Sequence, residues 1–158
     1  MSIDLSNLPD LEIGNVAPDF NLKNQKGEDI QLSKVLASWK RVLLVFYPGD
    51  MTPGCTVQLC GIRNVFADYE KAGVKVYGMN HKDAKSHQRF IDMHGYQFDI
   101  LVDTDRILQY KYGAVKSFIG KASTKRGVFL IDTDGKILYK VWGQQDNQKI
   151  LELIADLN

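Results

Sequence analysis

The chain has 158 residues, of which 44% are hydrophobic and 25% charged, values typical of one ordinary globular domain. Its 20 basic and 19 acidic residues give a net charge of +1, which argues against a nucleic-acid or anionic-membrane partner. No apolar run approaches the roughly 18 residues of a membrane span, and the acidic start MSIDLSNLPDLEIG is unlike a signal or transit peptide. We therefore expect a single domain over residues 1–158 in a reducing cytoplasm, with no membrane partner.

The first predicted elements are two short strands in APDFNLKNQKGEDIQLS, residues 17–33. Apolar and polar residues alternate on both sides of NQKG, which supplies the turn residues, and this pattern is typical of a β-hairpin. The next stretch, RVLLVFY at 41–47, is almost continuously apolar. That composition indicates a strand buried on both faces, as in a parallel sheet.

A loop and a helix follow this strand. Residues 48–54, PGDMTPG, contain two prolines and two glycines and predict a loop. Apolar residues then recur at helical spacing over 55–72, and Gly73 predicts the end of that helix. Gly61 lies inside the helix and weakens it by about 1 kcal/mol relative to alanine.

Strands and helices continue to alternate up to the C-terminus. The remaining predicted elements are strands at 74–79, 98–103, 127–132 and 136–143 and helices at 82–95, 105–113 and 147–157. Asp134 and Gly135 supply the turn of an antiparallel hairpin. The order predicts an α/β fold with a thioredoxin-like central sheet flanked by helices and an N-terminal β-hairpin addition.

Both cysteines of the chain lie in the single stretch YPGDMTPGCTVQLCGIR, separated by four residues. A structural zinc site requires four cysteine or histidine ligands. The three histidines, His81, His87 and His94, belong to a separate predicted strand–helix unit. We therefore expect no metal site here.

A permanent disulfide between Cys55 and Cys60 conflicts with the predicted helix. Five positions along a helix separate two Cα atoms by about 8.7 Å, with the side chains rotated by about 140°. A disulfide requires Cα atoms within about 7 Å. The two cysteines can bond only if the first turn of the helix melts, so the segment would have two states. Cys60 as a small buried apolar residue is the alternative.

The position of Cys55 favours reactivity. It lies where the predicted helix begins, and a helix N-terminus offers unpaired N–H groups and partial positive charge. Both favour the thiolate, which is the nucleophilic form of cysteine.

The same residues carry a resemblance to a known family. YPGDMTPGCTVQLC resembles the active-site segment of the peroxiredoxins, whose pattern Pro-x3-Thr/Ser-x2-Cys is met here by Pro48, Thr52 and Cys55. A second cysteine five positions later resembles the subfamily called peroxiredoxin Q or bacterioferritin comigratory protein. APDFNL, KGEDIQLS, KYGA and RGVFLIDTDGKI also resemble family segments in the family's order, over roughly residues 14–142.

The resemblance implies a role for each site residue. Cys55 would attack the peroxide and become a sulfenic acid, and Cys60 would resolve it as an intramolecular disulfide. Thr52 would hydrogen-bond the peroxide and the thiolate, while Pro48 would shield the site. Arg126 would lie near the sulfur from a distant strand, where its charge favours the thiolate and stabilises the leaving oxygen.

Each assignment has an alternative in the sequence alone. Thr52 is also a good helix N-cap, Pro48 is also ordinary loop punctuation, and Arg126 is also a solvated charge before a strand. The chain departs from the family at Gln58, where glutamate is frequent, at GMNHKD (78–83), and at GQQDNQ (143–148). These departures leave open what His81 and Gln144 contact.

The resemblance implies a thiol-dependent peroxidase that reduces hydrogen peroxide and organic hydroperoxides without a cofactor. Thioredoxin or a glutaredoxin-type donor would reduce its disulfide, and resolution within one chain leads us to expect a monomer. Two alternatives remain. One is a thiol–disulfide oxidoreductase, which the missing Cys-x-x-C disfavours. The other is a peroxide-sensing redox switch that signals by melting the Cys55 helix.

Overall fold

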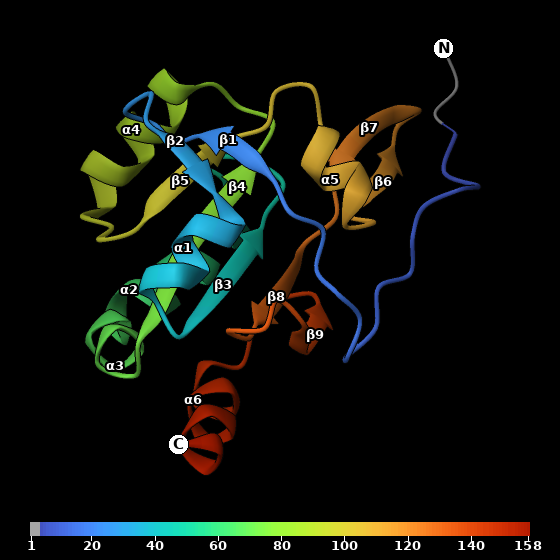
Figure 1. Ribbon diagram of the computed structural model, residues 1–158. Coiled ribbons are helices and arrows are strands. Elements are labelled where there is room, and N and C mark those ends of the chain that lie inside the picture. The colour runs from blue at the N-terminus through green and yellow to red at the C-terminus, as the bar shows by residue number, and fades with distance from the viewer. Residues whose placement is uncertain (1–3) are drawn as a thin grey trace.

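A computed structural model describes residues 4–158, and its centre is a five-stranded mixed sheet (Figure 1). The strand order is β5-β4-β3-β8-β9, with β3, β4 and β5 parallel and β8 and β9 antiparallel to their neighbours. The five strands are β3 (Arg41–Phe46), β4 (Val74–Asn80), β5 (Asp99–Val102), β8 (Gly127–Ile131) and β9 (Ile137–Trp142). The predicted mixed α/β architecture is therefore confirmed.

Helices cover both faces of the sheet and bury two separate apolar clusters. The helices are α1 (Leu32–Ser38), α2 (Pro53–Asn64), α3 (Phe66–Lys71), α4 (Ala84–His94), α5 (Ile107–Lys111) and α6 (Asn147–Leu157). Because β3 side chains alternate between faces, Leu43 and Val45 join the cluster under α2, α3, α4 and α6, which includes Cys55. Val42 and Leu44 join the cluster under α1 and α5. Cys55 is thus anchored to the core from the more heavily covered face.

Two small hairpins lie outside the central sheet. The predicted N-terminal hairpin is present as β1 (Asn21–Lys23) and β2 (Asp29–Gln31). A second hairpin, β6 (Val115–Phe118) with β7 (Lys121–Thr124), and helix α1 were not predicted. The β6–β7 turn uses Ile119 and Gly120, both with positive φ. Isoleucine is a poor residue for that conformation, so the sequence carries little turn signal there.

The predicted helix over 55–72 is wrong in one respect. It is two helices, α2 and α3, broken at Val65, whose φ of −119° and ψ of 18° lie outside the helical range. The predicted stop at Gly95 is confirmed, since that residue caps α4 with φ of 66°. The predicted single domain over 1–158 includes residues 1–3, which lie outside the described part of the chain.

None of the helices in residues 4–158 has the length and apolar character needed to cross a bilayer.

Candidate active site

The loop between β3 and α2 places Cys55 at the carboxyl ends of the parallel strands. Pro53 occupies the first turn of α2, and its fixed φ and missing N–H suit that position. Cys55 follows in the same turn, where backbone N–H groups have no helical partner. Its side chain is only 1% exposed, yet residues 51–54 are exposed, so the sulfur lies just beneath the surface.

Arg126 makes the most direct contact with this sulfur. Its Nη2 donates to Cys55 Sγ at 3.3 Å, and its Nη1 donates to the carbonyl of Gly54 at 3.4 Å. The guanidinium is permanently charged, so it stabilises negative charge on the sulfur. The structure therefore brings together two predicted site residues that are 71 positions apart.

Strand pairing explains how Arg126 reaches Cys55. β3 and β8 are antiparallel and Phe46 lies opposite Gly127, so Arg126, one residue earlier, lies beside the start of the loop. Gly54 provides room for it, because a Cβ built at Gly54 would lie 3.3 Å from Arg126 Nη2. The register between β3 and β8 therefore places the positive charge of Arg126 beside the sulfur of Cys55.

Gln58 holds Arg126 from the other side. This residue is 1% exposed, and its Oε1 accepts a short hydrogen bond from Arg126 Nη1. A neutral amide orients the guanidinium without cancelling its charge. The sequence marked Gln58 only as a departure from the family, and its position one helical turn after Cys55 was the available signal for this role.

Thr52 and Pro48 lie in the loop as predicted. Thr52 is the N-cap residue of α2, but its side chain makes no capping hydrogen bond. Its hydroxyl instead donates to the Gly49 carbonyl at 3.1 Å, and its own carbonyl accepts from the Thr56 amide at 2.9 Å. With its proton committed to Gly49, the Thr52 oxygen is left to accept a hydrogen bond. Pro48 is half-buried between Tyr47 and Gly49.

Cys60 lies in the same helix as Cys55, and both are free thiols. Its half-buried sulfur is 3.5 Å from the hydroxyl of Tyr96. Burial and the hydrogen bond to Cys60 raise the pKa of Tyr96 well above its usual value, so the phenol keeps its proton at neutral pH. Helix geometry keeps the two sulfurs from bonding while α2 is intact.

The segment after β9 packs against the outside of α2. Gln144 Nε2 donates to the Gly54 carbonyl at 3.5 Å and Gln145 Nε2 donates to the Gln58 carbonyl at 3.1 Å. Within the described residues, Gln58 Nε2 and Gln145 Oε1 are buried without a protein partner. The hydrogen bonds from Gln144 and Gln145 stabilise the helical form of α2, although two buried polar atoms at this contact have no hydrogen-bond partner within residues 4–158.

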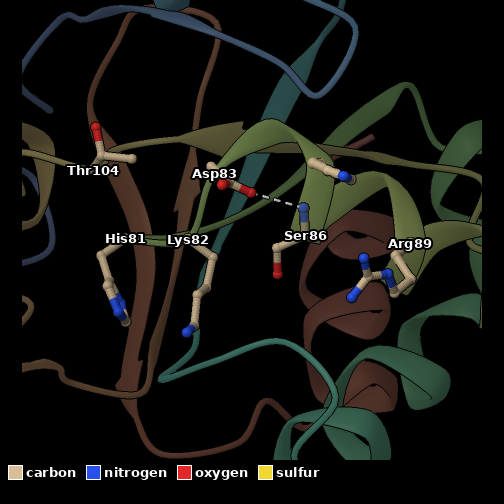
Figure 2. Close-up of a pocket in the computed structure, with 7 residues that line it drawn as sticks. His81, Lys82, Asp83, Ser86, Arg89 and Thr104 are labelled. Atoms are coloured by element: carbon tan, nitrogen blue, oxygen red, sulfur yellow. Dashed lines mark hydrogen bonds between the residues drawn. The ribbon is translucent and has the colours of Figure 1, made fainter.

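His81 lies away from these contacts, in a pocket of about 480 Å³ beside the N-terminus of α4 (Figure 2). Burial, together with the charges of Arg106 and Lys82, lowers the pKa of His81. The ring is therefore mainly neutral at neutral pH. Among residues 4–158, no three His, Cys, Asp or Glu side chains gather as a metal-binding group.

Comparison with known proteins gives consistent results. The model of the AhpC/TSA family matches residues 13–140. Peroxiredoxin Bcp of Escherichia coli (strain K12) is 41% identical over 131 residues, covering 80% of this chain and 83% of that protein. Peroxiredoxin Q, chloroplastic, of Triticum aestivum is 36% identical over 126 residues, covering 80% of this chain and 57% of that protein.

A solved structure has the same fold. The crystal structure of peroxidoxin BcpB from Mycobacterium tuberculosis matches with a TM-score of 0.87 and 27% identity, covering 94% of this chain and 99% of that one. The thioredoxin-like sheet predicted from the sequence, with its N-terminal hairpin, is thereby confirmed.

Proposed function

The chain belongs to the AhpC/TSA family and is a peroxiredoxin of the Bcp and Q type, and we propose that Cys55 is the cysteine that attacks the peroxide. As a peroxiredoxin it is a thiol-dependent peroxidase. The observation that carries the assignment of Cys55 is the 3.3 Å contact between its sulfur and Arg126 Nη2 at the start of α2. A permanent positive charge there favours the thiolate that the reaction requires.

The first chemical step is attack of the Cys55 thiolate on one peroxide oxygen. The O–O bond breaks, Cys55 becomes a sulfenic acid, and the other oxygen leaves as an alkoxide or hydroxide that takes up a proton. Arg126 and the free amides of the first turn of α2 stabilise the charge on the leaving oxygen. The Thr52 oxygen accepts the hydrogen bond of the peroxide O–H, because its own proton is used by Gly49.

The second step is condensation of the Cys55 sulfenic acid with the Cys60 thiol, which forms a disulfide and releases water. Both residues lie in α2, so the helix unwinds between them before the sulfurs meet. Thioredoxin or a glutaredoxin-type dithiol then reduces the disulfide and restores both thiols.

The wider assignments of substrate and setting follow from this chemistry. Hydrogen peroxide and organic hydroperoxides are both substrates, since the attacked bond is the same in each. Because both cysteines come from one chain, a monomer suffices for the full cycle. We propose that residues 1–158 form a single domain and that it acts in the cytoplasm. No cofactor takes part in any step.

Exchange of Cys55 for serine tests the proposal most directly. Peroxide consumption with thioredoxin and its reductase is expected to fall to the background rate in Cys55→Ser, because a serine hydroxyl is not ionised at neutral pH. The matched variant Cys60→Ser should retain one turnover per chain, with a sulfenic acid that a sulfenate-selective probe labels. Wild-type activity in Cys55→Ser would refute the assignment.

Mass spectrometry of the oxidised wild-type protein separates resolution within a chain from resolution between chains. A monomer lighter by two hydrogens, with Cys55 and Cys60 in one cross-linked peptide, is expected. A covalent dimer as the main product would contradict the role given to Cys60 and the monomeric state.

A further inference from the structure

Asp50 is buried in the loop before α2, and the peroxidase chemistry above gives it no role. Its side chain is saturated with hydrogen bonds although the residue is only 8% exposed. Oδ1 accepts from the Tyr47 hydroxyl at 2.7 Å and from Asn80 Nδ2 at 3.0 Å. Oδ2 accepts from the Ser86 hydroxyl at 2.7 Å and from His87 Nδ1 at 2.7 Å. With two donors to each oxygen, the whole acceptor capacity of the carboxylate is used.

The four donors tie the loop to three elements of the fold. Tyr47 follows β3, Asn80 ends β4, and Ser86 and His87 lie in the first half of α4. Ser86 also lines the pocket beside that helix, so the network reaches toward the surface there (Figure 2). The loop is therefore fixed at Asp50 to the carboxyl ends of neighbouring parallel strands.

The hydrogen bonds of His87 define its charge. The ring is fully buried, with Nδ1 facing Asp50 Oδ2 and Nε2 facing the Leu101 carbonyl at 3.0 Å. A backbone carbonyl only accepts, so Nε2 carries a proton. The carboxylate beside Nδ1 is already accepting from three other donors, so Nδ1 carries a proton too. The ring is then an imidazolium paired with an aspartate.

The environment of Asp50 agrees with this charge state. Burial on its own would raise the pKa of Asp50, but hydrogen bonds from His87, Tyr47 and Ser86 and the charge of His87 lower it to about 2. The carboxylate is therefore ionised at neutral pH. A buried pair of opposite charges whose remaining polar atoms are all satisfied is stable where a single charge would not be.

The backbone next to Asp50 needs such an anchor. Met51 has φ of 64°, a left-handed conformation that is strained for a residue with a Cβ. Strained residues persist where the surrounding contacts determine the chain path. Asp50 fixes the chain before Met51, and the hydrogen bond from Thr52 to Gly49 fixes it afterwards.

We propose that Asp50 and His87 form a buried aspartate–imidazolium anchor that positions Pro48 and Thr52 over Cys55 and stays in place while α2 unwinds. The donors to Asp50 all lie outside α2, so melting of residues 53–60 breaks none of these bonds. Asp50 and His87 are positioning residues, and they act on the peroxide step through the 47–52 loop. The proposal rests on the assignment of Cys55 as the attacking residue.

Nitrogen NMR of the histidine rings tests the anchor in the wild-type protein without peroxide. Both His87 nitrogens are expected to show the protonated imidazolium signature at neutral pH, in the dithiol form and in the Cys55–Cys60 disulfide form. His94, on the same helix, provides an internal reference. A singly protonated His87 ring in the dithiol form, or a signature lost on disulfide formation, would overturn the proposal.

Rapid kinetics tests the positioning role. In Asp50→Asn and His87→Gln, sulfenic acid formation is expected to slow by roughly 10- to 100-fold, because the 47–52 loop loses its position. The following disulfide step should keep its wild-type rate, since it depends on unwinding of α2. Ser86→Ala removes one donor and keeps the pair, so it should slow the first step only a few-fold and serves if the other variants do not fold.

Tyr112→Phe is the matched control for loss of a buried hydrogen bond. The Tyr112 hydroxyl donates to the Pro18 carbonyl at 2.7 Å in the other apolar cluster. Wild-type rates are expected for both steps in this variant. If both steps slowed equally in Asp50→Asn, or if Tyr112→Phe slowed the first step as much, Asp50 and His87 would contribute only to general stability and would not position the loop. The ring spectra are recorded without peroxide and do not depend on which cysteine attacks it, so the anchor and the assignment of Cys55 can fail separately.

Discussion

The chain on either side of Thr52 is held in two different ways. Upstream, Asp50 makes four hydrogen bonds in the interior and its position depends on strands and a neighbouring helix. Downstream, the first turns of α2 are braced from outside by Arg126, Gln144 and Gln145. The upstream contacts suit a part that stays fixed, and the downstream ones suit a part that is released. In the mechanism that we propose, the fixed loop orients the peroxide and the release of α2 then brings the sulfurs of Cys55 and Cys60 together.

The largest expected effect is on the rate of sulfenic acid formation, and it comes from removal of Arg126, which contacts the first turns of α2. In Arg126→Met, sulfenic acid formation is expected to slow by about 10²–10³-fold, because the thiolate and the leaving oxygen lose a charged donor. The measurement is the second-order rate constant with hydrogen peroxide under single-turnover conditions. The matched control is Lys125→Met, whose ammonium lies over the Trp142 ring, and it should react at nearly the wild-type rate.

Equal slowing in both variants would show that net positive charge near the site, and not the contact with Cys55, sets the rate.

Acid pH should weaken the hydrogen-bond network of Asp50, which holds the chain upstream of Thr52. The pKa of Asp50 is lowered from 3.8 to about 2 in the folded chain, so its contribution to stability is complete above about pH 4 and is lost as pH falls through 2. The shift is equivalent to roughly 2 kcal/mol of unfolding free energy. Urea titrations between pH 4 and pH 2 should show this slope in the wild-type protein and a flatter one in Asp50→Asn.

Asp10→Asn is the control for the acid titration, because Asp10 is an exposed partner of Lys140. It should keep the wild-type slope. A wild-type slope in Asp50→Asn would mean that the Asp50 carboxylate gains nothing from its burial in the network.

Gln58→Glu should weaken the charge at the site while keeping the shape. A carboxylate in contact with Arg126 would neutralise part of the field at Cys55, so alkylation of Cys55 by iodoacetamide at neutral pH should slow by about tenfold, equivalent to ~1.4 kcal/mol. The assay uses a Cys60→Ser background so that one thiol reacts. Gln97→Glu adds the same charge at an exposed position and should have little effect.

Faster alkylation in Gln58→Glu would show that the orientation of Arg126 outweighs its net charge.

The sequence was sufficient to predict the central elements and the place of Cys55 at the start of α2. Strand β3 and the loop around Pro48 carry strong local signals, a continuous apolar run and a cluster of proline and glycine. The position of Arg126 came from family resemblance alone. Its physical basis is the pairing of Phe46 with Gly127, a long-range register that local patterns do not encode.

The sequence did not predict the roles of Asp50, His87 and Gln58, because these roles depend on contacts between distant residues. Asp50 reads as an ordinary turn residue and His87 as an ordinary helix residue until the fold places them 2.7 Å apart. Gln58 was recognised only as a departure from the family, because its partner Arg126 lies 68 positions away, just before β8. The break at Val65 and the Ile119 turn were missed for the opposite reason, since local propensity there is weak or contrary.

The smallest expected effect concerns the brace on the outside of α2. Gln145→Ala removes the hydrogen bond to the Gln58 carbonyl, which is worth about 1 kcal/mol to the helical form. Because disulfide formation requires α2 to unwind, the step from sulfenic acid to disulfide should become about two- to fivefold faster, while the first step changes little. Quenched-flow mass spectrometry after a peroxide pulse measures both. Gln148→Ala, on the exposed side of α6, is the control. A slower disulfide step in Gln145→Ala would mean that the segment after β9 guides the unwound chain instead of bracing the helix, and both sides of Thr52 would then serve to position the cysteines.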